Sequence, residues 1–192
     1  MIRIARREDV SRMLDIYGPY VRDTSVSFEY NIPSESEFLQ RFQEITVQFP
    51  WILWEENGEI LGYAYGSAPF VRAAFGWCAE SSIYLSPEAR RKGIGKKLYD
   101  ALEKILFYQG YRVLYALITD ENRDSIRFHR SLGYRIRAEL PGCGYKFGRR
   151  LGLVWMEKTA FFVESPSKVP TSWGQIVQDD EILSHILGTF SL

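Results

Sequence analysis

The stretch whose residue types and spacing most clearly suggest chemistry is the glycine loop RRKGIGKK, residues 90–97. Five cations flank Gly93 and Gly95, and the residues that follow are spaced as in an amphipathic helix. A helix start offers unpaired backbone N–H groups and a partial positive charge, and glycines let a phosphate approach closely. The loop therefore predicts a ligand with a pyrophosphate. The alternative is a solvated helix start whose glycines merely turn the chain.

Two common phosphate-binding motifs fail at positions that define them. A dinucleotide fingerprint needs a third glycine three residues after Gly95, where Leu98 stands. A Walker loop needs a glycine at position 90 and a hydroxyl at position 97, where the residues are Arg90 and Lys97. The loop must therefore serve another kind of phosphate ligand.

Three other side chains could move protons or acyl groups. Glu80 begins a strand-like segment among Trp77, Cys78 and Ala79, whose burial would raise its pKa toward that of a useful base. The alternative is a strand-end carboxylate paired with an arginine. His129, on a short helix, is either an acid or a residue at the edge of the core. Cys143, in the glycine-rich turn PGCGYK, could carry an acyl group covalently or simply fill space.

These residues must be positioned by strands and helices, which the hydrophobic spacing predicts in a mixed order. Ser34 and Glu37 have capping-box spacing, and Asn57-Gly58 predicts a hairpin turn. The run 113–119 is continuously apolar, as in a strand buried on both faces. Strands are expected at 1–5, on both sides of the 57–58 turn within 51–68, and at 77–85, 113–119, 134–140 and 153–161, with helices at 7–21, 34–49, 94–109 and 122–132. The order predicts an α/β fold with a mixed, mostly antiparallel sheet and helices on both faces.

Length and composition bound the function. The chain has 192 residues, enough for one domain, and 24 basic residues balance 24 acidic ones. This balance gives no global attraction to nucleic acid or membrane. Two cysteines predict neither a metal site nor a disulfide framework, and the sequence lacks a signal-peptide core or an 18-residue apolar run. We therefore expect a cytoplasmic protein.

The loop resembles the Q/R-x-x-G-x-G/A coenzyme A loop of the GCN5-related N-acetyltransferases (GNAT), with Arg90, Gly93 and Gly95 at its defining positions. DTSVSFEY, FPWILWEENGEILGYAYGSA, WCAESSIYLSP, SIRFHRSLGY and GYKFGR resemble the phosphinothricin and methionine sulfoximine acetyltransferase branch. This resemblance covers about residues 2–160. It implies a GNAT domain over 1–162 with a splayed central strand pair, acetyl-CoA as co-substrate, no metal, and commonly a homodimer. The remaining tail, 163–192, is rich in Pro and Ser at first and then has helical spacing at Ile182, Leu183, Ile186 and Leu187.

The resemblance also implies residue roles. The backbone of Ile83, Tyr84 and Leu85 would pair with the pantetheine arm and polarise the thioester carbonyl, and Asn122 would bond the same arm. Glu80 would act as general base, and His129 would protonate the departing thiolate. The pyrophosphate would be held by Arg90, Arg91, Lys92, Gly93, Ile94, Gly95 and Lys96, and the acceptor pocket would contain Phe28, Arg72, Glu80, Ser81 and Ser82.

The chemistry of amine acetylation favours an α-amine as acceptor. Neutralising an α-amino group at pH 7 costs about 1 kcal/mol, whereas a lysine amine costs about 4–5 kcal/mol. Arg72 would suit a substrate carboxylate, although it could also be a surface cation. The branch usually continues differently after GYKFGR, where this chain has Arg150, Leu151 and Gly152. We therefore predict direct acetyl transfer to a small amino-acid-like amine. The alternatives are a protein N-terminus or a polyamine as acceptor, or an acyl-CoA sensor without turnover.

Overall fold

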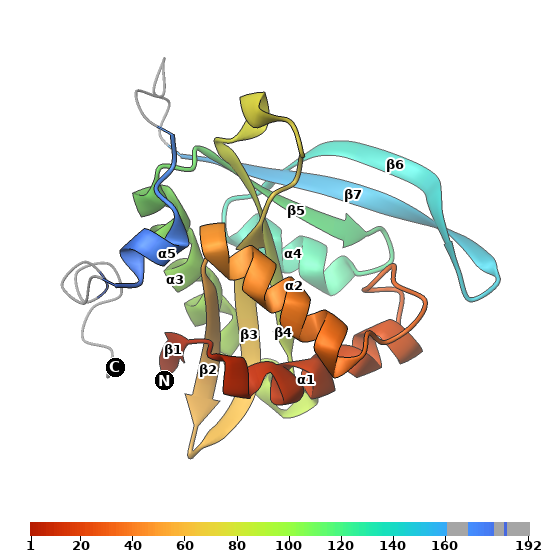
Figure 1. Cartoon of the computed structure of the whole chain (residues 1–192). Helices are drawn as coiled ribbons and strands as arrows, with labels where there is room; N and C mark the ends of the chain where they lie inside the picture. The colour runs from red at the N-terminus through yellow and green to blue at the C-terminus, as the bar shows by residue number, and fades with distance from the viewer. Residues whose placement is uncertain (161–168, 179–182, 184–192) are drawn as a thin grey trace.

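A computed structural model describes residues 1–160, 169–178 and 183 of the chain. Figure 1 shows a twisted, open sheet with α1 and α2 on one face and α3 and α4 on the other. The strand order is β1-β2-β3-β4-β5-β7-β6, and every neighbouring pair is antiparallel except β4 and β5. The strands are β1 (Ile2–Ile4), β2 (Trp51–Glu56), β3 (Glu59–Ser67), β4 (Cys78–Leu85), β5 (Val113–Thr119), β6 (Arg135–Lys146) and β7 (Arg149–Thr159). The predicted mixed, mostly antiparallel α/β sheet is confirmed.

The helices bury one side each and divide the core in two. They are α1 (Val10–Asp23), α2 (Glu35–Gln48), α3 (Ile94–Gln109), α4 (Arg123–Ser131) and the single-turn α5 (Trp173–Ile176). Trp51 and Tyr63 pack with α1 and α2 on one face, while Leu98 and Leu102 of α3 pack with Leu114 on the other. Each large side chain buried in this way contributes about 1.5–3 kcal/mol.

Local sequence signals explain several boundaries. Ser34 Oγ accepts the N–H of Glu37 while the Glu37 carboxylate accepts the N–H of Ser34, so the predicted capping box starts α2. Asn57 and Gly58 both have positive φ, as the hairpin between β2 and β3 requires. Asn122 Oδ1 accepts the N–H of Ser125 and so caps the start of α4, the helix expected from residue 122.

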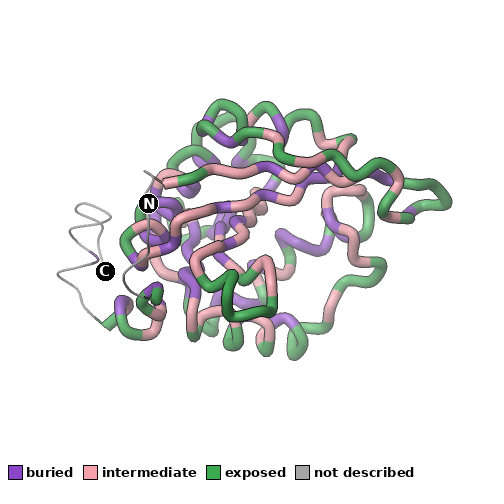
Figure 2. The backbone as a smooth tube through the Cα atoms, turned by 90° about the horizontal axis from the view of Figure 1, so that it is seen from above, coloured by how far each residue is buried: buried purple, intermediate pink, exposed green. Residues whose placement is uncertain are grey.

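Two strand predictions need correction. Only one face of strand β5 is fully buried, the face of Leu114, Ala116 and Ile118. On the other face Val113, Tyr115 and Leu117 are half-buried, and the Tyr115 ring packs edge-on against Phe70 of the β3–β4 loop. The segment around Cys143 is part of β6, with a register irregularity between Leu140 and Gly144, because β6 and β7 pair beyond the expected limits. The far end of this hairpin, seen from above in Figure 2, extends from the body as mostly exposed chain.

The described part of the C-terminal region packs on the body of the protein. Trp173 and Ile176 are buried with the core around α3, and Thr171 and Gln109 exchange hydrogen bonds. The composition had indicated a surface tail here, but these two apolar side chains cover the end of α3 instead. The predicted domain boundary at 162/163 lies outside the described residues. So do Ile182, Ile186 and Leu187 of the expected helix, while Leu183 is buried.

Candidate active site

The site is an opening between β4 and β5. These parallel strands pair only from Cys78 to Glu80, opposite residues 113–115, and then separate. Beyond that point β4 stays with β3 as far as Leu85, while β5 stays with β7 as far as Thr119. The splayed central strand pair is therefore confirmed. An inner pocket of about 60 Å³ lies in the opening and is lined by both strands together with Asn122 and His129.

A larger outer cleft continues from this pocket. It has a volume of about 970 Å³ and shares Ile83 and Asn122 with the inner pocket. Of the residues predicted to bind the coenzyme, Ile83, Leu85, Arg90, Arg91, Gly95 and Asn122 line it. The cleft therefore runs from the glycine loop to the point where the strands part.

The glycine loop has the backbone of an anion site. Arg91 and Gly93 both have positive φ, 61° and 76°, and α3 begins directly after Gly93. Among the described residues, no side chain caps this helix start, and nothing lies within 4 Å of a Cβ built on Gly93. The first N–H groups of α3 are therefore accessible to a diphosphate, and Arg90 and Arg91 line the adjoining cleft.

The other predicted loop residues have different surroundings. Ile94 is buried in the core, so it can serve the site only through its backbone. Lys96 Nζ is 2.8 Å from Asp100 Oδ2, and Lys97 Nζ lies 5.1 Å above the Trp54 ring. Lys92 is exposed. The cations are thus distributed around the helix start rather than all directed into the cleft.

The backbone of β4 has one N–H and one C=O group, both of Ile83, that face the opening between the strands. Ser86 N–H donates to Leu61 O of the β3 side, so by the alternation of an antiparallel pair Tyr84 also bonds β3 while Ile83 and Leu85 face the opening. Both groups of Leu85 contact Tyr20 Oη, which donates to its carbonyl at 2.5 Å. Ile83 is therefore the member of the predicted trio whose N–H and C=O face the opening without β5 or Tyr20 as partner.

Glu80 lies where the strands part, on the face of the sheet that α1 and α2 cover. Side chains alternate along β4, so Glu80 shares a face with Ser82 and Tyr84. Burial raises the pKa of the Glu80 carboxyl above its usual value. Within the described part of the chain Glu80 forms no ion pair, and a desolvated carboxylate without a cationic partner is suited to accept a proton.

His129 lies on the opposite side of β4, in the inner pocket, and is buried. Its Nδ1 is 2.8 Å from the Ser125 carbonyl, which can only accept, so Nδ1 carries the proton. Its Nε2 is 2.7 Å from Tyr99 Oη. Burial lowers the pKa of His129 to about 4, so the imidazole is neutral near pH 7. The acid role stays a prediction, and the proton that faces Nε2 belongs to Tyr99.

The predicted acceptor residues are only partly gathered. Ser82 lies beside Glu80 on one face of β4, whereas Ser81 points to the other face and is hydrogen-bonded to Tyr115 O at 3.0 Å. Phe28 packs directly over Gly144 of β6. Arg72 precedes a single turn in the β3–β4 loop and is exposed. Its contact with a substrate carboxylate stays a prediction.

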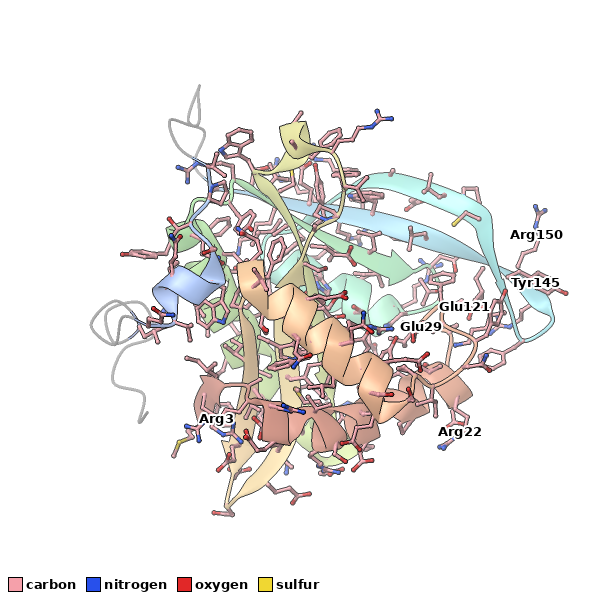
Figure 3. All side chains as sticks on the ribbon, in the orientation of Figure 1. Arg3, Arg22, Glu29, Glu121, Tyr145 and Arg150 are labelled. Carbon is pink, nitrogen blue, oxygen red and sulfur yellow. The ribbon has the colours of Figure 1, made fainter. Side chains whose placement is uncertain are left out.

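The loop between α1 and α2 is fastened to the β6–β7 hairpin. Lys146 Nζ is buried and donates to the carbonyls of Val21, Thr24 and Ser27 at 2.6–2.9 Å. Tyr30 Oη donates to Tyr145 O at 2.6 Å. Figure 3 shows Tyr145 at the outer end of the hairpin and Glu29 between the hairpin and α2. These bonds hold the loop that carries Phe28 against the hairpin, where Phe28 packs over Gly144.

Sequence reasoning missed several side chains that shape the site. Tyr20 and Tyr99 come from helices whose spacing only marks them as core residues. Tyr65 lies beside Ser82, and burial raises the pKa of Tyr65 to about 12, with a smaller contribution from the nearby Glu80. Arg41 Nη2 is 2.8 Å from Glu29 Oε1. These partners are distant in sequence, so no local motif could have found them.

The proteins that this chain resembles are named as acetyltransferases. Residues 11–134 match the model of the acetyltransferase (GNAT) family. The chain is 33% identical over 147 residues to a phosphinothricin N-acetyltransferase of Streptomyces viridochromogenes, covering 77% of this chain and 80% of the relative. It is 31% identical to an L-methionine sulfoximine/L-methionine sulfone acetyltransferase of Salmonella typhimurium, over 81% of this chain and 92% of the relative.

A solved structure shows the same fold with the co-substrate bound. It is a GNAT superfamily phosphinothricin acetyltransferase from Sinorhizobium meliloti in complex with acetyl-CoA, 36% identical, with a TM-score of 0.82 over 89% of this chain and 92% of that chain. The chain belongs to the GNAT family, and it is an N-acetyltransferase that uses acetyl-CoA. The cleft, the open helix start and the unpaired strand fit that molecule.

Other kinds of site find no support in the described part of the chain. Within residues 1–160, 169–178 and 183, no group of three or more His, Cys, Asp or Glu side chains could hold a metal ion. None of the helices described is both long enough and apolar enough to span a membrane.

Proposed function

We propose that the acceptor is the α-amine of a small amino-acid-like molecule of the phosphinothricin or methionine sulfoximine type. The observation that carries this proposal is a desolvated carboxylate, Glu80, at the point where β4 and β5 part. The activities for which the relatives are named support the same class of acceptor.

Acetyl transfer proceeds directly from acetyl-CoA to the amine in a ternary complex. The diphosphate binds the N–H groups at the start of α3, and the pantetheine arm lies along Ile83 with Asn122 beside it. Glu80 removes a proton as the amine attacks, and the Ile83 N–H stabilises the oxyanion. Cys143 takes no part, because it is exposed on β6 and lines neither the inner pocket nor the outer cleft.

The α1–α2 loop and the β6–β7 hairpin border the proposed acceptor region, and this confinement favours a small substrate over an extended peptide. Lys146 and Tyr30 hold the α1–α2 loop against the β6–β7 hairpin, which limits the room around Phe28. Small size and an α-amine are properties that both proposed acceptors share. An acyl-CoA sensor without turnover would have no need for Glu80.

A panel of amines tests this proposal. Thiol release from acetyl-CoA should be fastest with phosphinothricin or methionine sulfoximine and slowest with spermidine and a short peptide. The peptide belongs in the panel because a ribosomal-protein-alanine N-acetyltransferase from Brucella melitensis has 30% identity and a TM-score of 0.81. Faster turnover of peptide or spermidine would overturn the acceptor assignment.

The proposal includes a cytoplasmic homodimer. Three aromatic side chains on the loop and hairpin, Tyr30, Tyr145 and Phe147, are more than half exposed, as a partner surface requires. Sedimentation should give twice the mass of 22.3 kDa. A monomer at micromolar concentration, or a dimer unaffected by Tyr145→Lys, would refute this surface.

A further inference from the structure

Arg41, on α2, is a half-buried arginine that the proposed reaction does not use. Its guanidinium lies over the Phe38 ring, 5.8 Å from the ring centre, and its Nη2 is 2.8 Å from Glu29 Oε1. The two charged side chains are 34% and 36% exposed. Figure 3 shows Glu29 between the β6–β7 hairpin and α2. Because solvent reaches both partners, this guanidinium can exchange one carboxylate for another.

A closed set of contacts places Arg41 next to the wall of the inner pocket. Glu29 N–H donates to Ser27 Oγ at 3.2 Å, and Ser27 Oγ is 2.7 Å from Tyr17 Oη. The Arg41 guanidinium also interacts with the Tyr17 hydroxyl. The Tyr17 ring packs edge-on against Tyr84, with 4.8 Å between the ring centres, and Tyr84 lines the inner pocket. A single ring, that of Tyr17, therefore separates Arg41 from the pocket wall.

Arg41 and the proposed base lie on the same side of the sheet. Glu80 and Ser82 point to the face that α1 and α2 cover. Tyr65 of β3 is the register partner of Ser82, and both Glu80 and Arg41 are close enough to influence the pKa of Tyr65. An acceptor whose amine meets Glu80 can therefore direct its carboxylate toward α2.

The surroundings of Arg41 suit a substrate carboxylate better than those of Arg72, the arginine that the family resemblance implies. Arg72 is exposed in the β3–β4 loop, where water screens its charge. Arg41 is half-buried, so its charge acts in a lower local dielectric. Its partner Glu29 directly follows Phe28, a predicted acceptor residue. A carboxylate already occupies this guanidinium, which shows that its geometry fits one.

We propose that Arg41 binds the carboxylate of the acceptor and that Glu29 holds this guanidinium before the acceptor binds. The exchange keeps the Arg41 charge paired, and the planar fork of N–H donors fits either carboxylate in a two-pronged contact. Glu29 is partly exposed, so water solvates its carboxylate once it is displaced. This inference rests on the proposed function, because it requires an acceptor that carries a carboxylate.

Acceptors with and without a free carboxylate test the assignment. KM is measured for methionine sulfoximine and for its methyl ester at saturating acetyl-CoA. Arg41→Gln should raise the KM for methionine sulfoximine at least about tenfold and change that for the ester less than about twofold. Glu29→Gln removes the competing carboxylate, so it should lower the KM for methionine sulfoximine about two- to fivefold and leave that for the ester unchanged. A pair that only fastened the loop would change both acceptors in the same direction.

Two further variants complete the experiment. Arg22→Gln is the matched control, because Arg22 pairs with Asp23 at 2.8 Å in an exposed position, and it should leave both KM values unchanged. Arg72→Gln tests the competing arginine: a raised KM for methionine sulfoximine there, and not in Arg41→Gln, would overturn the assignment. If Arg41→Gln does not fold, Glu29→Gln decides, since a lowered KM requires a folded enzyme.

The failure of this inference differs from the failure of the proposed function. Equal effects of Arg41→Gln or Glu29→Gln on acid and ester would overturn the inference while the unaltered protein still acetylates methionine sulfoximine. If the unaltered protein acetylates neither acceptor, the proposed function fails before any variant is compared, and the inference fails with it.

Discussion

Gly144→Ala probes the packing of Phe28, a predicted acceptor residue, against β6. A Cβ at position 144 would lie 2.3 Å from Phe28 Cε1 and 2.8 Å from its Cδ1. Carbon atoms in contact are normally about 3.5–4.0 Å apart, so the ring must move by more than about 1 Å. Gly144 has no left-handed backbone conformation to strain. The whole effect therefore comes from the displaced ring.

The expected size follows from overpacking, which costs about 1–3 kcal/mol. For a domain of this length each kcal/mol lowers Tm by about 2–4 °C, so Gly144→Ala should lower it by about 2–12 °C. Because Phe28 is proposed to contact the acceptor and not the coenzyme, the KM for the amine should rise while the KM for acetyl-CoA stays the same. Calorimetry and steady-state assays with each substrate varied in turn measure both effects.

A double-mutant cycle separates the clash from other causes. All three atoms nearest to the added Cβ belong to Phe28, so Gly144→Ala should cost little in a Phe28→Ala background. Gly148→Ala, in the same hairpin, is the control, because it meets open space and only strains a positive φ. Additive effects of the two substitutions, or a raised KM for acetyl-CoA alone, would refute the placement of Phe28.

Three other substitutions test the rest of the site. Glu80→Gln should lower turnover about 10²- to 10⁴-fold. Because burial raises the pKa of Glu80, ionisation of this carboxyl lowers the stability of the folded protein as pH rises. The variant should therefore have a higher Tm than the unchanged protein at pH 7 and no advantage below about pH 4. Gly93→Val forces a branched side chain into φ 76° and should abolish acetyl-CoA binding in calorimetry, whereas Gly58→Val, also at positive φ, should leave binding intact. Lys146→Met leaves three carbonyls without their donor and should destabilise the protein by about 1–3 kcal/mol in urea unfolding. Unaltered turnover, binding or unfolding would contradict the respective role.

Local chemistry explains why some features were predictable. The capping and turn roles of Ser34, Asn57 and Asn122 involve residues no more than three positions away, so a short stretch of sequence is enough to predict them. The glycine loop was legible for the same reason. The coenzyme and the fold came from the resemblance of long segments, and the comparisons confirm both.

The remaining features depend on contacts between distant segments. Lys146 meets carbonyls more than 100 residues away, and Trp173 packs on a core formed by α3. The neutral state of His129 follows from burial and from the Ser125 carbonyl, neither of which its residue type reveals. For such residues the residue type shows which chemistry is possible, and only the packing determines which atom carries a proton.

Two phenol groups lie at the two ends of the opening between β4 and β5. A strand that loses its neighbour must satisfy its exposed backbone groups elsewhere. Tyr99 of α3 contacts the carbonyl of Ser81 at one end, and Tyr20 of α1 contacts both backbone groups of Leu85 at the other. Between them Ile83 faces the opening, where an arm with amide groups can take the place of β5. Because Glu80 and Ser81 are consecutive in β4, their side chains lie on opposite faces of the strand, so the proposed base is on one side of β4 and the buried pair Tyr99 and His129 is on the other.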